Sequence, residues 1–251
     1  LMGPGTIGMA ATQVNLVVNN QLATGEGTGA VSWLNYAFRL MYLPIGLFGV
    51  SIATATLPTV SRQVTEQNLA AVRNTVARGI SLMLMLNVPA TTGLVVLGVP
   101  IVRVIFERGA FEPADTLATA AAVQFYAIGL VGYSVVRIVS PVFYALGKNR
   151  VLVIVSVIAV LVNAPLNTML VRVMGYTGLA LGTSLPPLVN PSVLFVLLRH
   201  HVGSLNEDRL AGSALRIVLA SAAMGAAALS LDRWLSQAIP DPALGWQILR
   251  L

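Results

Sequence analysis

One arginine lies inside a chain segment that is otherwise apolar. Arg39 belongs to the run SWLNYAFRLMYLPIGLFGVSIATATLP, residues 32 to 58, and Pro44 follows five residues later. A guanidinium group binds phosphate or carboxylate through forked, charge-assisted hydrogen bonds. In a helix that starts near Val31, Arg39 lies about 12 Å along the axis, close to the middle of a membrane span. An arginine there costs at least about 2.5 kcal/mol on insertion and needs a partner or a water-filled cavity.

The apolar intervals of the chain contain no acid that could pair with Arg39. All nine acidic residues lie in connectors or near the ends of intervals: Glu26, Glu66, Glu107, Glu112, Asp115, Glu207, Asp208, Asp232 and Asp241. We therefore predict that Arg39 faces an aqueous cavity and binds an anionic substrate. The alternative is a span displaced by a turn or two, with Arg39 at the outer interface. Arg137 is a second candidate, facing either the cavity or the cytoplasmic interface.

Amide side chains are further candidates for substrate binding. Gln13, Asn15, Asn19 and Asn20 recur at near-helical spacing in the first apolar interval. They either line the cavity or form hydrogen bonds between helices. We assign Asn15, Asn19 and also Asn35 to the substrate site. The chain has no cysteine, and the adjacent His200 and His201 make a poor metal site by themselves, so we expect neither a metal nor a cofactor.

Prolines and glycines interrupt the apolar intervals. Pro44 removes the hydrogen bond to the carbonyl of Leu40 and should bend the helix just after Arg39, while Gly46 and Gly49 allow close packing or further bending. Pro89 repeats this pattern in the next interval. Broken helices are typical of transporters that rock between two access states, so we assign these four residues as hinges. Ordinary proline enrichment in membrane helices is the alternative.

The composition predicts that lipid surrounds most of the chain. The 251 residues are 56% hydrophobic and only 10% charged, with a mean hydropathy of +0.81. Soluble domains are about 25% charged. Long apolar intervals occur at 1–25, 40–61, 79–102, 116–136, 151–171, 173–198 and about 210–231. Because backbone groups in lipid must be hydrogen-bonded internally, we predict seven helical spans in an all-α, polytopic membrane bundle. The first interval lacks the features of a signal peptide, so we expect a fragment of a longer protein.

The basic residues fall unequally on the two sides of these spans. One side collects eight cations: Arg62, Arg73, Arg78, Lys148, Arg150, Arg199, Arg209 and Arg216. The other collects four: Arg103, Arg108, Arg172 and Arg233. The positive-inside rule places the 61–78 loop in the cytoplasm and explains the net charge of +6 without nucleic acid.

Two connectors have an internal pattern of their own. Residues 62–78 are either a short amphipathic helix on the cytoplasmic surface or a solvated connector. Residues 99–112 suit an interfacial helix end with an ion pair between Arg103 and Glu107, four residues apart. The chain contains no phosphate-binding G-x-x-x-x-G-K-[ST] element and no catalytic set that can be placed, so we predict that it is not an enzyme.

Four motifs resemble one family of membrane proteins. They are NLVVNNQLA (15–23), GAVSWLNYAFRLMYLPIGLFGVSIATATLPTVSR (29–62), VIFERGAF (104–111) and YSVVRIVSPVFYALG (133–147). These runs resemble the MurJ (MviN) lipid II flippases of the multidrug/oligosaccharidyl-lipid/polysaccharide exporter superfamily. The resemblance is specific from Gly8 to about Gly147 and continues to about Arg233 by hydropathy and spacing.

The resemblance implies a fold of fourteen helices, with two six-helix lobes around a central cavity and two C-terminal helices that form a groove for the lipid tail. This chain would supply the second lobe (1–200), the thirteenth helix (about 210–231, within 201–251) and the start of a truncated last helix. Arg39 matches a cavity arginine implicated in holding the lipid-linked pyrophosphate, and Arg137 matches a cation of less defined role. Some relatives carry an acid where this chain has Phe38 or Asn19.

The function implied is translocation of lipid II, the polyprenyl pyrophosphate-linked peptidoglycan precursor, across the bacterial cytoplasmic membrane. The expected partners are this lipid, membrane lipids and the first lobe of the same protein. The alternatives are a flippase for another lipid-linked oligosaccharide, a cation-coupled drug exporter of the same superfamily, and a non-transporting scaffold for cell-wall enzymes.

Overall fold

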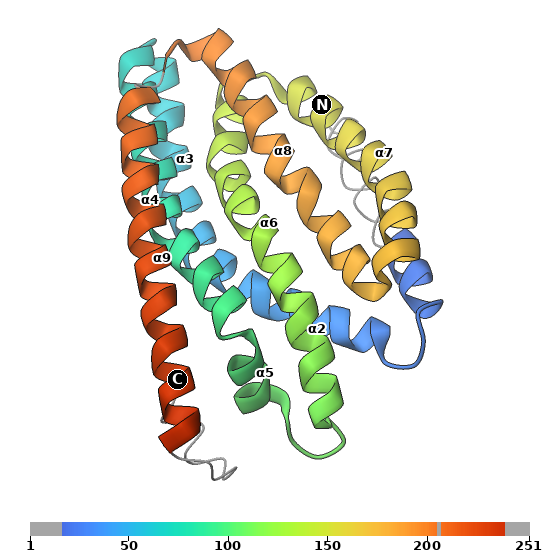
Figure 1. Cartoon of the computed structure of the whole chain (residues 1–251). Coiled ribbons are helices and arrows are strands. Elements are labelled where there is room, and N and C mark those ends of the chain that lie inside the picture. Colours follow the sequence, from blue (N-terminus) through green and yellow to red (C-terminus); the bar gives the residue numbers. More distant parts are fainter. Residues whose placement is uncertain (1–16, 205–206, 239–251) are drawn as a thin grey trace.

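A computed structural model of the chain describes residues 17–204 and 207–238, with side chains described for 17–204 and 210–235 (Figure 1). A helical stretch covers residues 17–24. The further helices are α2 (Ala30–Pro44), the π-helical turn η1 (Ile45–Gly49), α3 (Val50–Thr65), α4 (Leu69–Val96), α5 (Gly98–Phe106), α6 (Pro113–Ala145), α7 (Asn149–Met174), α8 (Tyr176–Val202) and α9 (Glu207–Ala238).

Six helices of the described part are long and apolar enough to cross a membrane: Ala30–Thr65, Leu69–Val96, Pro113–Ala145, Asn149–Met174, Tyr176–Val202 and Leu210–Leu235. They confirm the predicted all-α membrane bundle. The remaining predicted span is the first along the chain, the interval 1–25, and most of it lies outside the described residues.

The 61–78 segment differs from both predictions for it. α3 continues to Thr65, and α4 already begins at Leu69, so no separate surface helix or long connector exists there. The reversal takes three residues, with Gln67 at φ 54° and the Asn68 side chain accepting a hydrogen bond from the Ala71 N–H as the N-cap of α4. The charged residues of this segment belong to the ends of two long helices that extend beyond their apolar parts.

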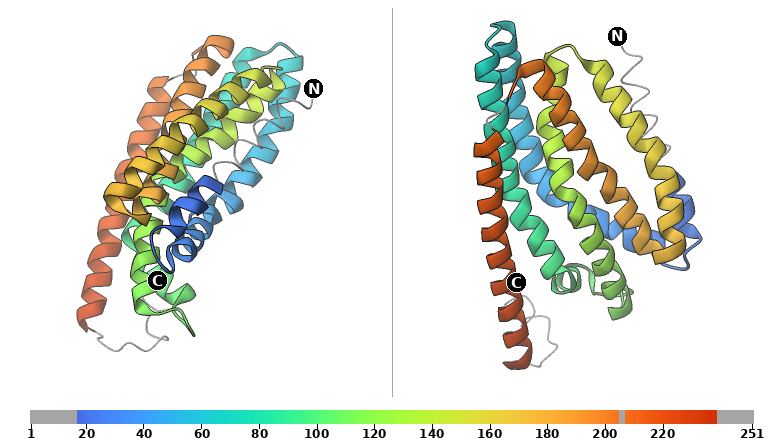
Figure 2. Two further views of the ribbon diagram at one scale, coloured as in Figure 1. Left: turned by 90° about the vertical axis from the view of Figure 1, so that its right-hand side faces the viewer. Right: turned by 45° about the horizontal axis from the view of Figure 1, so that its top comes forward.

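α2, η1 and α3 form one bent span. The missing N–H of Pro44 precedes η1, whose hydrogen bonds close one residue wider than those of an α-helix. Figures 1 and 2 show α2 lying across the lower part of the bundle and α3 running up beside α4. α4, in contrast, continues past Pro89 to Val96, and the chain departs from helix at Leu97 before α5.

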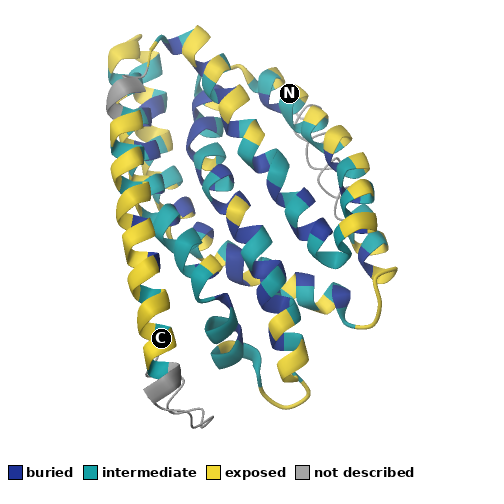
Figure 3. Cartoon of the chain, viewed as in Figure 1, coloured by how far each residue is buried: buried dark blue, intermediate teal, exposed yellow. Residues whose placement is uncertain are grey.

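α6 is the central helix of the bundle. Fifteen of its 33 residues are buried, and it contacts α2, α4 and α8 (Figure 3). Its backbone approaches α8 closely at two glycines, where a Cβ on Gly129 would lie 2.9 Å from the Cα of Ser184 and one on Gly132 would overlap the Pro187 carbonyl. Glycine permits this approach because it has no side chain.

The lower end of α6 is fixed by polar contacts. The Trp33 indole N–H donates to Asp115 Oδ1 at 2.7 Å, which ties α2 to the first turn of α6. The predicted ion pair at the end of α5 is confirmed, since Arg103 Nε and Glu107 Oε2 are 3.3 Å apart. The Trp33–Asp115 hydrogen bond holds α2, the helix that carries Arg39, against the bundle.

Candidate functional site

Arg39 lies on the exposed face of α2. Asn35, one turn earlier, is also exposed, and its Nδ2 donates to the Val31 carbonyl at 2.8 Å. Arg39 itself has no hydrogen bond or ion pair with any residue that the structure describes. The guanidinium group is therefore free to receive an anion.

Aromatic and buried apolar side chains anchor α2 to the bundle. The Phe38 ring lies 5.6 Å from that of Tyr126 on α6, and Tyr42 lies 6.0 Å from Tyr133. Ala37 and Met41 are completely buried beside them. These contacts set the rotation of α2 and leave the Arg39 side chain exposed.

Arg137 occupies an exposed position on α6 and also has no ion pair within the described part of the chain. It follows Tyr133 by four residues, and Arg39 precedes Tyr42 by three. Both arginines are therefore about one helical turn from the same Tyr42–Tyr133 contact, which joins their helices.

A pocket of about 180 Å³ opens between α6, α7 and α8. Its lining combines apolar side chains with hydroxyl and amide groups: Tyr133, Val136, Ser156, Ala159, Val160, Asn163, Thr183, Pro186, Pro187 and Asn190. Val136 is the direct neighbour of Arg137. The pocket therefore brings neutral hydrogen-bonding groups near the second predicted cation.

Asn19 belongs to a network of neutral groups that joins three helices. Its Nδ2 donates to Thr183 Oγ1 at 3.3 Å, and its Oδ1 accepts from Asn167 Nδ2. Asn167 also donates to Asn163 Oδ1 at 2.8 Å, and Asn163 Nδ2 donates to the Gly182 carbonyl at 2.7 Å. These bonds use Asn19 to connect helices, and its role toward substrate stays a prediction.

The sequence prediction missed Asn163 and Asn167. Both are buried on α7, and a signal was present, because two amides four residues apart in an apolar helix share one face. Asn15 lies outside the described residues. Among the residues that the structure describes, no three His, Asp or Glu side chains come close enough to hold a metal ion.

The assigned hinge residues have different surroundings. Gly46 is exposed, with open space where a Cβ would stand, whereas Gly49 is buried and a Cβ there would meet Met83 Cε at 3.3 Å. Pro89 lies inside the uninterrupted α4. The hinge role of Pro44, Gly46, Gly49 and Pro89 stays a prediction.

Known proteins share both the sequence and the fold of this chain. The sequence profile of the family Lipid II flippase MurJ matches residues 1–239. The chain is 33% identical over 249 residues to the probable lipid II flippase MurJ of Vibrio cholerae, covering 97% of this chain and 47% of that protein. It is 34% identical over 235 residues to the protein of the same name from Rhizobium meliloti, covering 93% and 43%. The chain spans about half the length of these curated relatives.

Solved structures of membrane transporters share the fold of this chain. A lipid II flippase MurJ in the inward closed conformation superimposes with a TM-score of 0.78 at 26% identity, over 97% of this chain and 48% of the other. An outward-facing multidrug resistance transporter of the MATE family and MOP superfamily matches with a TM-score of 0.70 at 16% identity, which shows a shared fold only. From the profile match and the relatives together, this chain is a member of the lipid II flippase MurJ family.

Proposed function

We propose that this chain is one membrane lobe of a lipid II flippase, which moves the lipid-linked peptidoglycan precursor from the inner to the outer leaflet of the bacterial cytoplasmic membrane. Family membership supports the substrate class. The observation that carries the proposal is Arg39, which is exposed and has no ion pair within the described residues, on a membrane helix that packs against α6. The rest of the central cavity would come from the part of the protein that this chain does not span.

Arg39 supplies the chemistry that a pyrophosphate requires. Its planar guanidinium group donates two parallel hydrogen bonds to phosphate oxygens, and a low-dielectric surrounding strengthens such bonds. Arg137, about one turn beyond the Tyr42–Tyr133 contact, would bind the second phosphate or the adjoining sugar. The exposed Asn35 and the amides of the neighbouring pocket offer neutral partners to the sugars.

Transport itself requires no bond to form or break. In this proposal the lobe moves as a unit, because α2, which carries Arg39, packs against α6. The span would bend at η1, directly after Pro44. Substrate binding at Arg39 would favour the state in which the cavity is closed around the head group. The protein is therefore a transporter and not an enzyme.

Charge supports one orientation in the membrane. The end of the bundle that holds the Thr65–Leu69 reversal also holds the start of α7 and the end of α8, with Lys148, Arg150 and Arg199. This end would face the cytoplasm. Arg39 then lies in the outer half of its span, and reaches the substrate in the cavity.

The test is Arg39→Ala in the complete protein, expressed in a strain depleted of its own lipid II flippase. Loss of a charge-assisted hydrogen bond costs about 1.5 to 3 kcal/mol. We therefore expect substrate affinity to fall at least about ten-fold, with loss of growth and of lipid II export. Arg39→Lys keeps the charge but loses the fork, so an intermediate result is expected.

Arg62→Ala is the matched control. Arg62 has a side chain 79% exposed and forms an ion pair with Glu66, the residue that follows its own helix, so its loss should leave export unchanged. Normal lipid II export by Arg39→Ala, with normal amounts of protein in the membrane, would refute the assigned role. Rescue of growth without lipid II export would favour the scaffold, and export of a different lipid-linked glycan would correct the substrate.

A further inference from the structure

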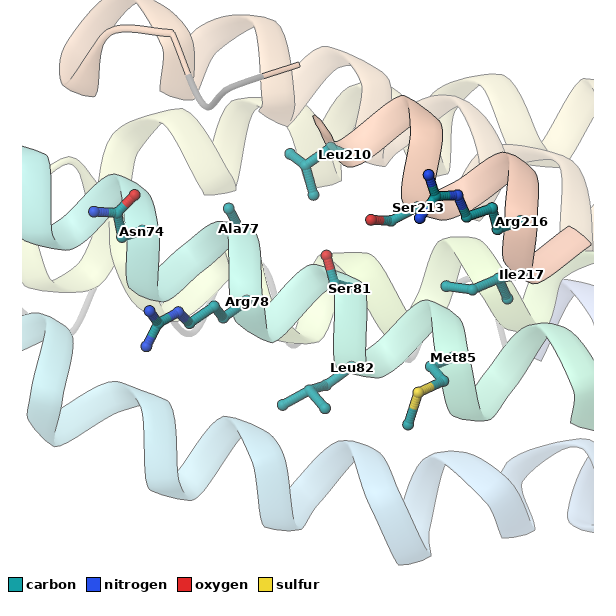
Figure 4. A pocket seen from close by; sticks show the side chains of 10 residues that line it. All are labelled: Asn74, Ala77, Arg78, Ser81, Leu82, Met85, Leu210, Ser213, Arg216 and Ile217. Atoms are coloured by element: carbon teal, nitrogen blue, oxygen red, sulfur yellow. The ribbon is translucent and has the colours of Figure 1, made fainter. Parts of the chain in front are cut away.

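A groove of about 840 Å³ separates α9 from α4 near the end of the bundle where both helices begin. Ten side chains line it: Asn74, Ala77, Arg78, Ser81, Leu82 and Met85 from α4, and Leu210, Ser213, Arg216 and Ile217 from α9 (Figure 4). Arg39, Arg137 and the pocket near them are on other helices. The groove is therefore separate from the proposed substrate site.

The two helices meet farther along and diverge toward the groove. A Cβ on Gly225 would lie 2.6 Å from Thr92 Cγ2, and Ser221, one turn earlier, is 2% exposed. Most other described side chains of α9 are exposed along its length (Figure 3). α9 thus rests on α4 through small residues, and the groove is the part of their interface that the described side chains do not fill.

Charge in the groove is positive and uncompensated. Arg78 and Arg216 lie at its two margins, and the head group of Arg216 reaches back toward Ser213 (Figure 4). Neither arginine has a hydrogen bond or ion pair in the part of the chain that the structure describes, and none of the lining residues is acidic. Asn74, Ser81 and Ser213 add hydrogen-bond donors between them.

The depth of the two arginines matches that of lipid head groups. Arg78 is the last charged residue of α4 before the charge-free stretch 79–96, and Arg216 is the last one of α9 before 217–231. Both therefore lie where their helices pass from polar surroundings into hydrocarbon. Phosphates of membrane lipids occupy this level, and basic clusters between membrane helices recruit anionic head groups.

Apolar side chains continue from the arginines toward the membrane interior. Met85 on α4 and Ile217 on α9 lie at the Arg216 end of the groove, and Leu82 lies between Arg78 and Met85 (Figure 4). A ligand that fills it must be anionic at one end and hydrocarbon at the other. Free phosphate satisfies only the first condition.

We propose that the groove between α4 and α9 binds an anionic glycerophospholipid of the membrane, with its phosphate beside Arg216 and Ser213, its polar head group extending along the groove toward Arg78, and an acyl chain along Met85 and Ile217. The lipid fills the open part of the interface and braces α9 against the lobe. A ligand that binds only the folded state stabilises it in proportion to the logarithm of its concentration over its dissociation constant.

The experiment uses the complete protein, delipidated in neutral detergent, with phosphatidylglycerol as the probe. Binding is followed by native mass spectrometry and by the thermal unfolding temperature. Phosphatidylglycerol should bind and raise this temperature, while phosphatidylcholine and inorganic phosphate should do so far less. Each arginine near the membrane surface contributes about 1 kcal/mol to the binding of anionic lipid. R78Q and R216Q should therefore each weaken phosphatidylglycerol binding about five-fold, and the double variant about 25-fold.

Arg150→Gln is the matched control, an exposed arginine at the same end of the bundle that does not line the groove. It should bind phosphatidylglycerol as the unchanged protein does. If the double variant fails to fold, the two single variants decide the question. Unchanged binding in the variants overturns the proposal, as does equal stabilisation by inorganic phosphate. Displacement of phosphatidylglycerol by a polyprenyl pyrophosphate lipid would instead assign the groove to the transported substrate.

Discussion

Replacement of Gly132 by alanine tests the central helix contact of the lobe. A Cβ there would overlap the Pro187 carbonyl oxygen and stand 2.9 Å from the Leu188 nitrogen. Since optimal heavy-atom separation is about 3.5 Å, the Leu188 nitrogen alone requires α6 and α8 to move apart by about 0.6 Å, and the overlap with the Pro187 carbonyl requires a larger shift. The obstacle is backbone, so no rotamer change relieves it. Overpacking of this kind costs about 1 to 3 kcal/mol.

Gly93→Ala is the control for this substitution. Gly93 lies in α4 with no atom within 4 Å of a built Cβ, so alanine there should stabilise the helix by about 0.5 to 1 kcal/mol. The assay is unfolding of the complete protein by increasing denaturant in mixed micelles, with both variants compared under one condition. If Gly132→Ala is as stable as Gly93→Ala, then α6 and α8 are not in backbone contact and the helix arrangement is wrong.

Two more glycines test α9 and the bend in the second span. Gly225→Ala should push α9 away from α4 and lower thermal stability by about 1 to 3 kcal/mol. Adding Thr92→Ser, which removes the blocking methyl group, should restore the stability. Failure of this rescue would contradict the contact between Gly225 and Thr92. Gly46→Ala meets no atom, so it should preserve stability but slow lipid II transport by stiffening η1. Unchanged transport would remove Gly46 from the hinge.

The hydropathy pattern predicted the spans better than it predicted the helices. Charge-free intervals mark the part of a helix in hydrocarbon, and the six long described helices each extend beyond their interval at one end or both. α4, for example, begins at Leu69, whereas its charge-free interval begins at Gly79. The residues between them looked like a connector because they are charged. They are charged because that end of the helix is in the polar interface.

The charge pattern agrees with the surroundings of Arg39, while its role toward substrate stays a prediction. The distribution of acids indicated that Arg39 has no partner within the spans, and in the described structure it is exposed and unpaired. The amide network could not be predicted in the same way, because which helices meet at Asn163 and Asn167 depends on tertiary contacts. Gly182 allows α7 and α8 to approach closely there, since a Cβ would collide with Asn167 Oδ1.

The two arginine sites differ in one physical respect, the surroundings of the cation. Arg39 lies in an apolar run and is exposed in the described structure, and in the proposed function an anion that enters through a cavity compensates its charge. Arg78 and Arg216 lie at the edge of hydrocarbon, where the membrane itself supplies phosphate continuously. A transported anion must leave again, whereas a resident lipid need not. We therefore expect binding at Arg39 to be weak enough for release, and binding in the α4–α9 groove to persist through purification in mild detergent.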